Sequence, residues 1–260
     1  MKAVRFDIMT LFPGMFQGPF EESIIKRARE RSLVEVYLHN IRDYAPDKHH
    51  VVDDYPYGGG AGMVLKPEPV YRALEAVKQT GVAAGYSAEP PSGPVPIVLL
   101  TPQGERFCQD TARELALQPW LILLCGHYEG VDERIRQHLV TREISIGDYV
   151  LTGGELPAMI LVEAVARLVP GVMGSPASGE EESFGGGLLE YPQYTRPAEF
   201  QGWPVPEVLL SGNHQEVSRW RRLQSVLRTA QRRPDLYAEA QVSKEERAWV
   251  TAQLVGQQTH

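Results

Sequence analysis

The sequence predicts an α/β fold with a mostly parallel sheet, followed by a small helical domain at the C-terminus. Short, continuous apolar runs recur through the first two-thirds of the 260-residue chain, as they do in buried parallel sheets. Helical patterns separate these runs, an alternation typical of a sheet covered by helices. Beyond about residue 170 the chain changes to a Gly-, Ser- and Pro-rich segment and then to a helical, basic one.

The elements of the first domain follow from these patterns. The predicted strands lie at residues 3–9, 34–38, 96–100, 120–125 and 142–146. The predicted helices lie at residues 19–31, 67–79, 105–117, 131–139 and 155–168. Residues 80–94 are predicted to form a surface loop that holds no chemically distinctive side chain.

The change of composition sets the expected domain boundaries. We predict a first domain at residues 1–173, a flexible linker at 174–186 and a helical domain at 187–260. The linker region is rich in Gly, Ser and Pro, contains an acidic cluster and lacks periodicity, which is typical of a mobile connection.

The C-terminal domain contains a basic segment, residues 213–233, that is predicted to form an amphipathic helix. It carries six arginines and one glutamate, a charge of +5, so the rest of the chain sums to −12 within the total of −7. Asn213, with Glu216 three residues later, resembles a capping box. Guanidinium groups suit phosphate, which favours a nucleic-acid partner. The alternative is a charged helix face that contacts only solvent.

The composition excludes several classes of protein. The chain is 43% hydrophobic and 23% charged, as in ordinary globular proteins. Two cysteines without a CxxC pair predict no disulfide framework and no cysteine zinc site, and favour a reducing compartment. No apolar run reaches the length of a membrane span, and the N-terminal apolar stretch is short and interrupted by Asp7, unlike a signal peptide. We therefore expect a cytoplasmic protein with no membrane contact.

Glycine-rich loops raise the question of a ligand. The segment YGGGAGM at residues 57–63 lacks the GK[ST] ending of a P-loop, and the first strand–helix unit lacks GxGxxG. Predicted turns do follow three late strands, at 101–105, 126–130 and 147–155. Each alone is an ordinary turn. Because ligands of open α/β sheets bind beyond the carboxyl ends of the strands, the three together favour one shared pocket.

Seven segments along the chain carry a family resemblance. They are VDDYPYGGGAGM, LLTPQGERF, LLCGHYEGVDER, SIGDYVLTGGELPAM, RLVPGV, LLEYPQYTRP and LLSGNHQEVSRWR. In this order they resemble the bacterial tRNA (guanine-N1)-methyltransferase family, TrmD, over roughly residues 5–235. So many distinctive segments in one order are far more specific than any single motif.

The resemblance implies a fold, an activity and a set of donor contacts. The fold is a SPOUT-class α/β domain with a deep trefoil knot, in a homodimer whose active sites lie at the subunit interface. The activity is S-adenosylmethionine-dependent methylation of N1 of the guanosine 3′ of the tRNA anticodon, position 37. The donor-binding residues that it implies are Thr101, Pro102, Gly126, Ile146, Gly147, Asp148, Tyr149, Val150, Leu151, Gly153 and Gly154.

The reaction needs a base near N1 and a cation near O6 of the guanine. By resemblance, the cation is Arg167 and the base is Glu182, where the family commonly has Asp. Glu is one methylene longer, about 1.5 Å, so Glu180 or Glu181 are alternative bases. These three glutamates could also form nothing more than a solvated linker. His127 stands where the family often has Arg, and we assign it no catalytic role.

The tRNA-binding residues that we expect on the basic helix are Arg219, Arg221, Arg222 and Arg228. No metal ligands are predicted, although the family is described as Mg²⁺-dependent. Two alternative functions remain at this point. One is a SPOUT methyltransferase for another RNA position, and the other is a non-catalytic RNA-binding relative.

Overall fold

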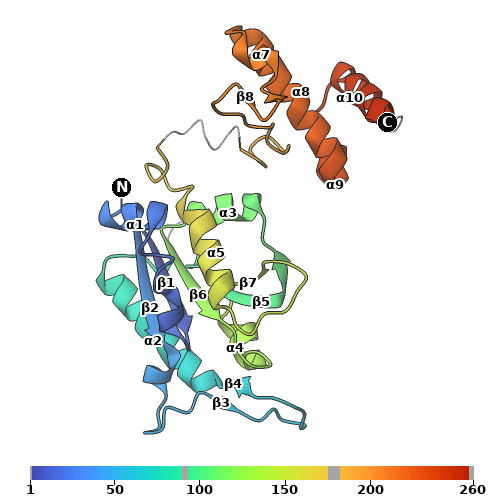
Figure 1. The fold of residues 1–260 in the computed structure, drawn as a ribbon. Coiled ribbons are helices and arrows are strands. Elements are labelled where there is room, and N and C mark those ends of the chain that lie inside the picture. The colour runs from blue at the N-terminus through green and yellow to red at the C-terminus, as the bar shows by residue number, and fades with distance from the viewer. Residues whose placement is uncertain (1, 90–92, 175–181, 258–260) are drawn as a thin grey trace. The chain divides into compact units, whose positions relative to one another are not determined.

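The chain forms two compact units, Met1–Gly174 and Ser175–His260. The structure, a computed structural model, describes residues 2–89, 93–174 and 182–257. In Figure 1 the first unit runs from blue to yellow and the second from orange to red. Of the predicted linker, residues 175–181 lie outside the described residues, and Glu180 and Glu181 lie there with them.

The first unit is built on a five-stranded sheet in which every pair of neighbours is parallel. In sheet order the strands are β2 (Val34–Asn40), β1 (Val4–Thr10), β6 (Trp120–Cys125), β5 (Ile97–Arg106) and β7 (Arg142–Ser145). Each of the five overlaps a predicted strand, and the prediction of a mostly parallel α/β fold is confirmed. β1 lies in the interior of the sheet, where Arg5 pairs with Trp120 of β6.

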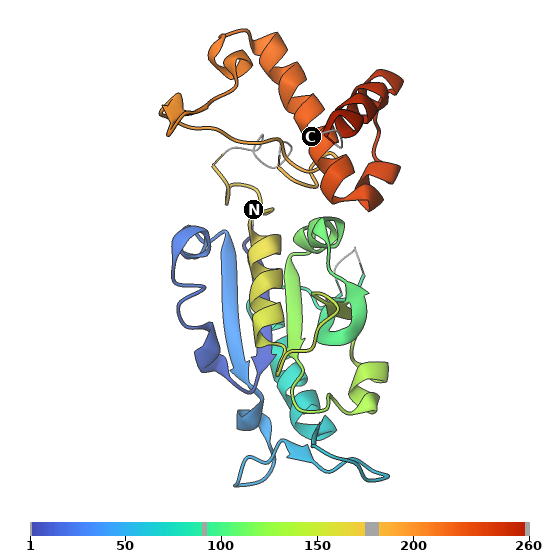
Figure 2. The same cartoon turned by 45° about the vertical axis from the view of Figure 1, so that its right-hand side comes forward.

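Helices cover both faces of this sheet (Figure 1, Figure 2). They are α1 (Ser23–Glu30), α2 (Pro67–Ala83), α3 (Gln109–Ala116), α4 (Glu133–His138) and α5 (Glu155–Ala166). Side chains alternate along a strand, so Phe6 and Ile8 of β1 join a buried core with α1, α3 and α5. Met9 points to the other face and joins a core with α2 and α4.

Two predicted boundaries in the first unit are wrong. The turn expected at 101–105 is an extended part of β5, and α3 starts only at Gln109. Leu100 and Glu105 both pair with Ile144 of β7, so residues 101–104 form an insertion in the strand rather than its end. Local sequence showed the turn-forming residues but not the second pairing with β7, which is a tertiary contact.

The other boundary is the end of α2. The surface loop expected from residue 80 begins later, because α2 continues to Ala83. Gly81 is buried in this last part of the helix, and a Cβ there would overlap the ring of Trp120. Because Gly81 has no side chain, the indole of Trp120 packs directly against the helix backbone. This packing offsets the low helix propensity of glycine. Tyr86, in the same predicted loop, is also buried.

A β-hairpin flanks the glycine-rich segment 57–63. Its strands, β3 (Asp53–Asp54) and β4 (Val64–Leu65), are antiparallel and very short. The backbone of Leu65 exchanges hydrogen bonds with Gly130 and Asp132, so the hairpin is tied to the segment after β6. Two short 3₁₀ helices, η1 (Pro13–Phe16) and η2 (Ile41–Tyr44), follow β1 and β2.

The second unit is mainly helical and has one small hairpin. Its elements are β8 (Glu199–Phe200), β9 (Trp203–Pro204), α7 (Glu207–Leu210), α8 (His214–Arg232), α9 (Pro234–Glu239) and α10 (Lys244–Gln257). α8 coincides with the predicted basic helix. The side chain of Asn213 caps it by accepting from the backbone N–H groups of Gln215 and Glu216. A small core joins Leu188 and residues of α8 and α10.

Candidate functional site

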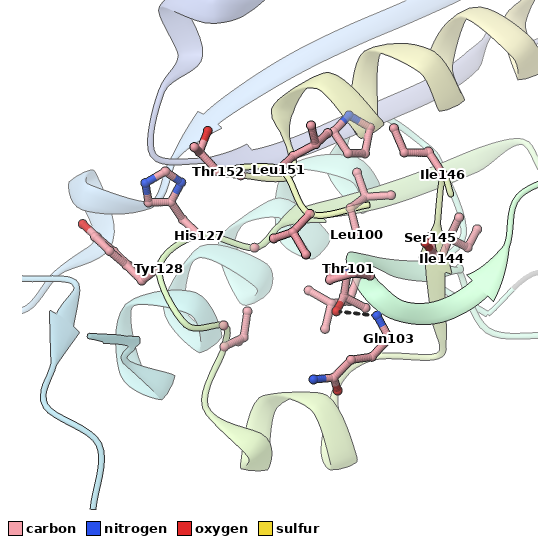
Figure 3. Close-up of a pocket in the computed structure, with 18 of the residues that line it drawn as sticks. Leu100, Thr101, Gln103, His127, Tyr128, Ile144, Ser145, Ile146, Leu151 and Thr152 are labelled. Atoms are coloured by element: carbon pink, nitrogen blue, oxygen red, sulfur yellow. Dashed lines mark hydrogen bonds between the residues drawn. The ribbon is translucent and has the colours of Figure 1, made fainter. Parts of the chain in front are cut away.

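A pocket lies at the carboxyl ends of β6 and β7 and beside the insertion in β5 (Figure 3). Its labelled residues come from β5 and its insertion, from the segment after β6, and from β7 and the segment that follows it. The lining includes most of the predicted donor-binding residues, namely Thr101, Pro102, Gly126, Ile146, Gly147, Tyr149, Val150, Leu151 and Gly153. The three glycine-containing segments therefore converge, as the rule for open α/β sheets leads one to expect.

The cavity has a volume of about 210 Å³. Ligand pockets commonly enclose roughly 300–1,000 Å³, so this cavity lies below that range. Its walls combine apolar side chains such as Leu100, Ile144 and Leu151 with backbone groups of the three segments. This mixture suits a flat heteroaromatic ring, which needs apolar contact on its faces and hydrogen bonds at its edge.

The segment after β7 is held by its own hydrogen bonds. The hydroxyl of Ser145 donates to the carbonyl of Gly147 over 3.0 Å, and the backbone N–H of Tyr149 donates to the same carbonyl over 2.9 Å. Gly147 has φ +152°, a conformation that favours glycine. These contacts give the segment a defined shape before any ligand binds.

Two of the predicted donor-binding residues do not line the pocket. Asp148 is exposed. Gly154 is buried, and its N–H donates to the carbonyl of Gly126 over 2.8 Å. A Cβ on Gly154 would lie 2.7 Å from the Cα of Cys125, so only glycine lets these two backbones approach. Gly154 shapes the pocket by bringing the segment after β7 back to β6.

His127 is a pocket residue to which the sequence analysis gave no role. Its Nδ1 is buried and has no hydrogen-bond partner among the described residues. The ring lies 5.0 Å from Phe12 and 4.7 Å from Tyr128, in tilted and edge-on geometry. An unpartnered buried nitrogen in a ligand pocket is a candidate contact for the ligand. The only sequence signal was its place directly after Gly126.

Glu155 is a second residue that the sequence analysis missed. It is the first residue of α5 and is buried. The hydroxyl of Thr10 donates to it over 2.7 Å, and the N-terminus of a helix favours a negative charge. Burial raises the pKa of the neighbouring Cys125 thiol well above its ordinary value, and the charge of Glu155 adds to this shift. The thiol therefore stays neutral beneath the pocket.

Arg167 lies just after α5, beside an apolar groove of the first unit. Leu156 and Ile160 of α5 line this groove and are 50% and 46% exposed. Tyr149 and Leu151 line both this groove and the pocket. The groove and the pocket are thus two sides of the segment after β7.

Glu182 lies in the second unit. It lines a small cavity together with Arg221, Arg222 and two serines of α8. Arg167 and Glu182 thus belong to different units.

The four predicted RNA-binding arginines of α8 differ in their surroundings. Arg222 donates to Glu246 of α10 and to the carbonyl of Gln241, both over 2.7 Å. The hydrogen bond from Arg222 lowers the pKa of Glu246. Arg228 donates to the carbonyl of Glu190 over 3.4 Å, and the guanidinium of Arg221 lies 4.9 Å from the ring centre of Tyr191.

Arg219, by contrast, is exposed on α8. It forms no hydrogen bond or ion pair with any residue that the structure describes. Arg219 is therefore the one member of this set whose charge is not already used in holding the second unit together.

Neither a metal cluster nor a membrane span is found in the described part of the chain. Among residues 2–89, 93–174 and 182–257, no three His, Cys, Asp or Glu side chains are grouped so that they could hold a metal ion. No described helix is long and apolar enough to cross a membrane.

Fold and pocket together define a class: α/β proteins with a parallel sheet and a pocket at the carboxyl edge of that sheet. The family model described as tRNA (Guanine-1)-methyltransferase TrmD matches residues 4–239. The chain belongs to this family, which confirms the resemblance seen in its seven segments, and it is an enzyme of the methyltransferase class.

Curated relatives agree over nearly the whole chain. A tRNA (guanine-N(1)-)-methyltransferase of Dehalococcoides mccartyi is 55% identical over 256 residues, 98% of this chain and 99% of the relative. Proteins of the same name from Pelotomaculum thermopropionicum and Geobacillus kaustophilus are 58% and 56% identical. The matches cover 94% of both chains in the first case, and 95% of this chain and 97% of the relative in the second.

Proposed function

We propose that the protein methylates N1 of guanine in tRNA, at the guanosine 3′ of the anticodon, with S-adenosylmethionine as methyl donor. The observation that carries the proposal is the convergence of three family segments on one pocket in a chain that matches the family from residue 4 to residue 239. The names of the relatives specify guanine as the modified nucleobase and N1 as the modified atom.

The pocket suits the adenosine part of the donor. In this proposal the adenine edge meets backbone groups of Gly126, Ile146, Gly147 and Tyr149–Leu151, and its faces contact the apolar side chains of Leu100 and Ile144. The unpartnered Nδ1 of His127 offers a further polar contact at the wall. When bound, the donor supplies an activated methyl group on a sulfonium, so the protein needs to supply position and charge rather than a metal.

The chain's own residues would supply the proton transfer. We assign Glu182 as the base that removes the N1 proton and Arg167 as the cation that stabilises charge on O6. Both sequence position and chemistry support this pairing. In this proposal the methyl acceptor is aligned by binding of the tRNA.

A homodimer follows from the surface of α5. Leu156 and Ile160 are large, half-exposed apolar residues. They lie next to Arg167 and next to the segment after β7. Contiguous apolar surface of this kind marks interaction sites. We infer that a second copy covers it, so that each active site lies at the subunit interface.

The remaining expectations belong to the same proposal. The return of the chain from β7 to β6 through the Gly154–Gly126 hydrogen bond supports a trefoil knot of the SPOUT type. Residues 187–260 form the tRNA-binding domain in this proposal. Arg219 is its main phosphate contact, and Arg221, Arg222 and Arg228 are further RNA contacts. We expect the enzyme in the cytoplasm, with its tRNA. No step is assigned to Mg²⁺.

The decisive experiment is methyl transfer from labelled donor to unmodified tRNA, followed by mapping of the modified nucleoside. We expect label at N1 of the guanosine 3′ of the anticodon. Transfer to another position would indicate a different RNA methyltransferase, and no transfer by folded, donor-binding enzyme would indicate an RNA-binding protein.

Glu182→Gln tests the base within the same assay. Single-turnover transfer should fall at least about a hundredfold, a typical contribution of general base catalysis, with donor and tRNA binding unchanged. Glu182→Asp should keep much of the rate, because Asp is the family's usual residue. Glu180→Gln and Glu181→Gln are the matched controls; loss of transfer in one of these, with Glu182→Gln active, would reassign the base.

A further inference from the structure

The second unit contains a cavity of about 500 Å³ that neither the donor nor the proposed base uses. It lies between the segment before α7 and the first half of α8. Its aromatic and cationic lining residues are Tyr191, Tyr194, Arg196, Trp220 and Arg221. None of the described residues that line it is acidic. The electrostatic character of the cavity therefore favours an anionic or electron-rich ligand.

Two aromatic rings form an open platform at this cavity. The rings of Tyr194 and Trp220 lie 6.3 Å apart at an angle of 55°. Tyr194 is 49% exposed, so part of its ring is left for a ligand. Aromatic side chains in a basic groove are the means by which proteins hold unpaired nucleotides, since every base has a π-face.

Arg221 forms the wall between this cavity and the one that holds Glu182, and Tyr191 shares that wall. The guanidinium of Arg221 is stacked on Tyr191, while its Nε is buried without a hydrogen-bond partner among the described residues. A buried donor of a charged group that lacks an acceptor is destabilising. A small rotation toward a bound phosphate or base edge would give it one.

We propose that this cavity binds one unpaired nucleotide of the substrate RNA. The base stacks on Tyr194 and Trp220, and the backbone phosphate is held by Arg196, with Arg221 as a second donor. The inference rests on the proposed function, in which RNA is the substrate. The shared wall makes the nucleotide site a neighbour of the cavity of Glu182, so one RNA strand can occupy both.

Three variants of the full-length protein test the site. Tyr194→Leu keeps an apolar side chain but removes the ring, Tyr194→Phe keeps the ring, and Phe200→Leu removes an exposed ring that does not line the cavity. Each is titrated with a short single-stranded RNA oligonucleotide and with an RNA duplex of equal length. Tyr194→Leu should weaken single-strand binding about fivefold or more, the lower end of one base–aromatic stack. The other two variants, and duplex binding in all three, should be unchanged.

Other outcomes would overturn the proposal. Unchanged single-strand affinity in Tyr194→Leu removes Tyr194 from the site, and equal losses in Phe200→Leu or for the duplex indicate a general effect. If Tyr194→Leu changes the oligomeric state in sedimentation but leaves single-strand affinity intact, the cavity is a contact between copies of the chain.

Methyl transfer, measured on the same preparations, separates this proposal from the proposed function. If Tyr194→Leu raises the KM for tRNA and leaves kcat and donor affinity unchanged, both stand. Wild-type enzyme that transfers no methyl group but binds single strands through Tyr194 would overturn the methylation and keep the nucleotide site. Normal transfer with an unchanged KM in Tyr194→Leu would overturn the site alone.

Discussion

At the scale of single residues, the first unit contains a fully buried carboxylate. Asp7 of β1 accepts hydrogen bonds from Arg5 (2.5 Å), from the ring of His39 (2.7 Å) and from the indole of Trp120 (2.7 Å). Burial alone would raise the pKa of Asp7, but the hydrogen bonds from His39 and Arg5 outweigh it and hold the pKa below its usual range. The charged form is therefore the one that the fold stabilises.

We expect Asp7→Asn to lower the free energy of unfolding at pH 7 by about 3 kcal/mol, because removal of one partner leaves a buried charge unpaired. A depressed pKa stabilises the fold above the unfolded value, about 3.9, and this stabilisation is lost as the pH falls through the folded value. The deficit of the variant should therefore shrink below about pH 4. Denaturant unfolding at pH 7 and at acidic pH measures both quantities.

Asp235 is the matched control for Asp7. It also pairs with an arginine two residues earlier, Arg233, whose hydrogen bond lowers the pKa of Asp235 to about 2. That pair is exposed, and exposed ion pairs contribute little. Asp235→Asn should leave stability unchanged at both pH values. Equal deficits in the two variants would mean that burial does not explain the role of Asp7.

Tyr149 provides a residue-scale test of the donor pocket. Tyr149→Ala should weaken donor binding about tenfold, since the segment after β7 loses the side chain that lines both the pocket and the groove. Titration calorimetry with S-adenosylmethionine measures this loss. Leu117→Ala, at an 82% exposed apolar residue of another segment, is the control. Wild-type affinity in Tyr149→Ala would remove this segment from the donor site.

At the scale of elements, sequence patterns predicted the strands better than the limits of the helices. β6 is a continuous apolar run because both of its faces are buried, and such a run is visible locally. The end of α2 depends on Gly81 meeting Trp120, and the insertion in β5 depends on pairing with β7. These contacts join residues far apart in the chain, which local propensity does not show.

The candidate site shows the same division. The three glycine-containing segments were found because they follow apolar runs that predicted strands, and strand ends in a parallel sheet share one edge. His127 and Glu155 were missed because their interest lies in burial: one has an unpartnered ring nitrogen, and the other is a buried carboxylate held by Thr10. Neither property is visible in composition or spacing.

The helix α8 carries the element-scale prediction. Arg219→Ala should weaken tRNA binding. It should also reduce the slope of log Kd against log salt concentration by about 1, because each phosphate contact releases counterions. Arg222→Ala should also loosen the docking of α10, through loss of its bond to Glu246. Arg72→Ala, an exposed arginine of α2, is the control. An unchanged salt slope in Arg219→Ala would make α8 a solvated face.

At the scale of the whole molecule, the exposed side of α5 provides a test of whether the enzyme is active as a dimer or as a monomer. Ile160→Glu should convert a dimer to monomers in sedimentation and abolish most methyl transfer, because a buried, unpaired charge at an interface is costly. Leu117→Glu, on a more exposed apolar residue, should do neither. A monomeric wild-type enzyme with full activity would contradict the shared active site.

The interior position of β1 in the sheet has a consequence for synthesis of the protein. One edge of β1 pairs with β2, which is synthesised soon after it. The other edge stays unpaired until β6 has been synthesised, more than a hundred residues later. At about 5–20 residues per second, the nascent chain exposes an apolar strand edge for several seconds or more, and such edges template aggregation. A fragment ending at residue 118 should pellet on centrifugation where residues 1–174 stay in the supernatant, so the nascent enzyme would depend on chaperones before it ever meets its substrate.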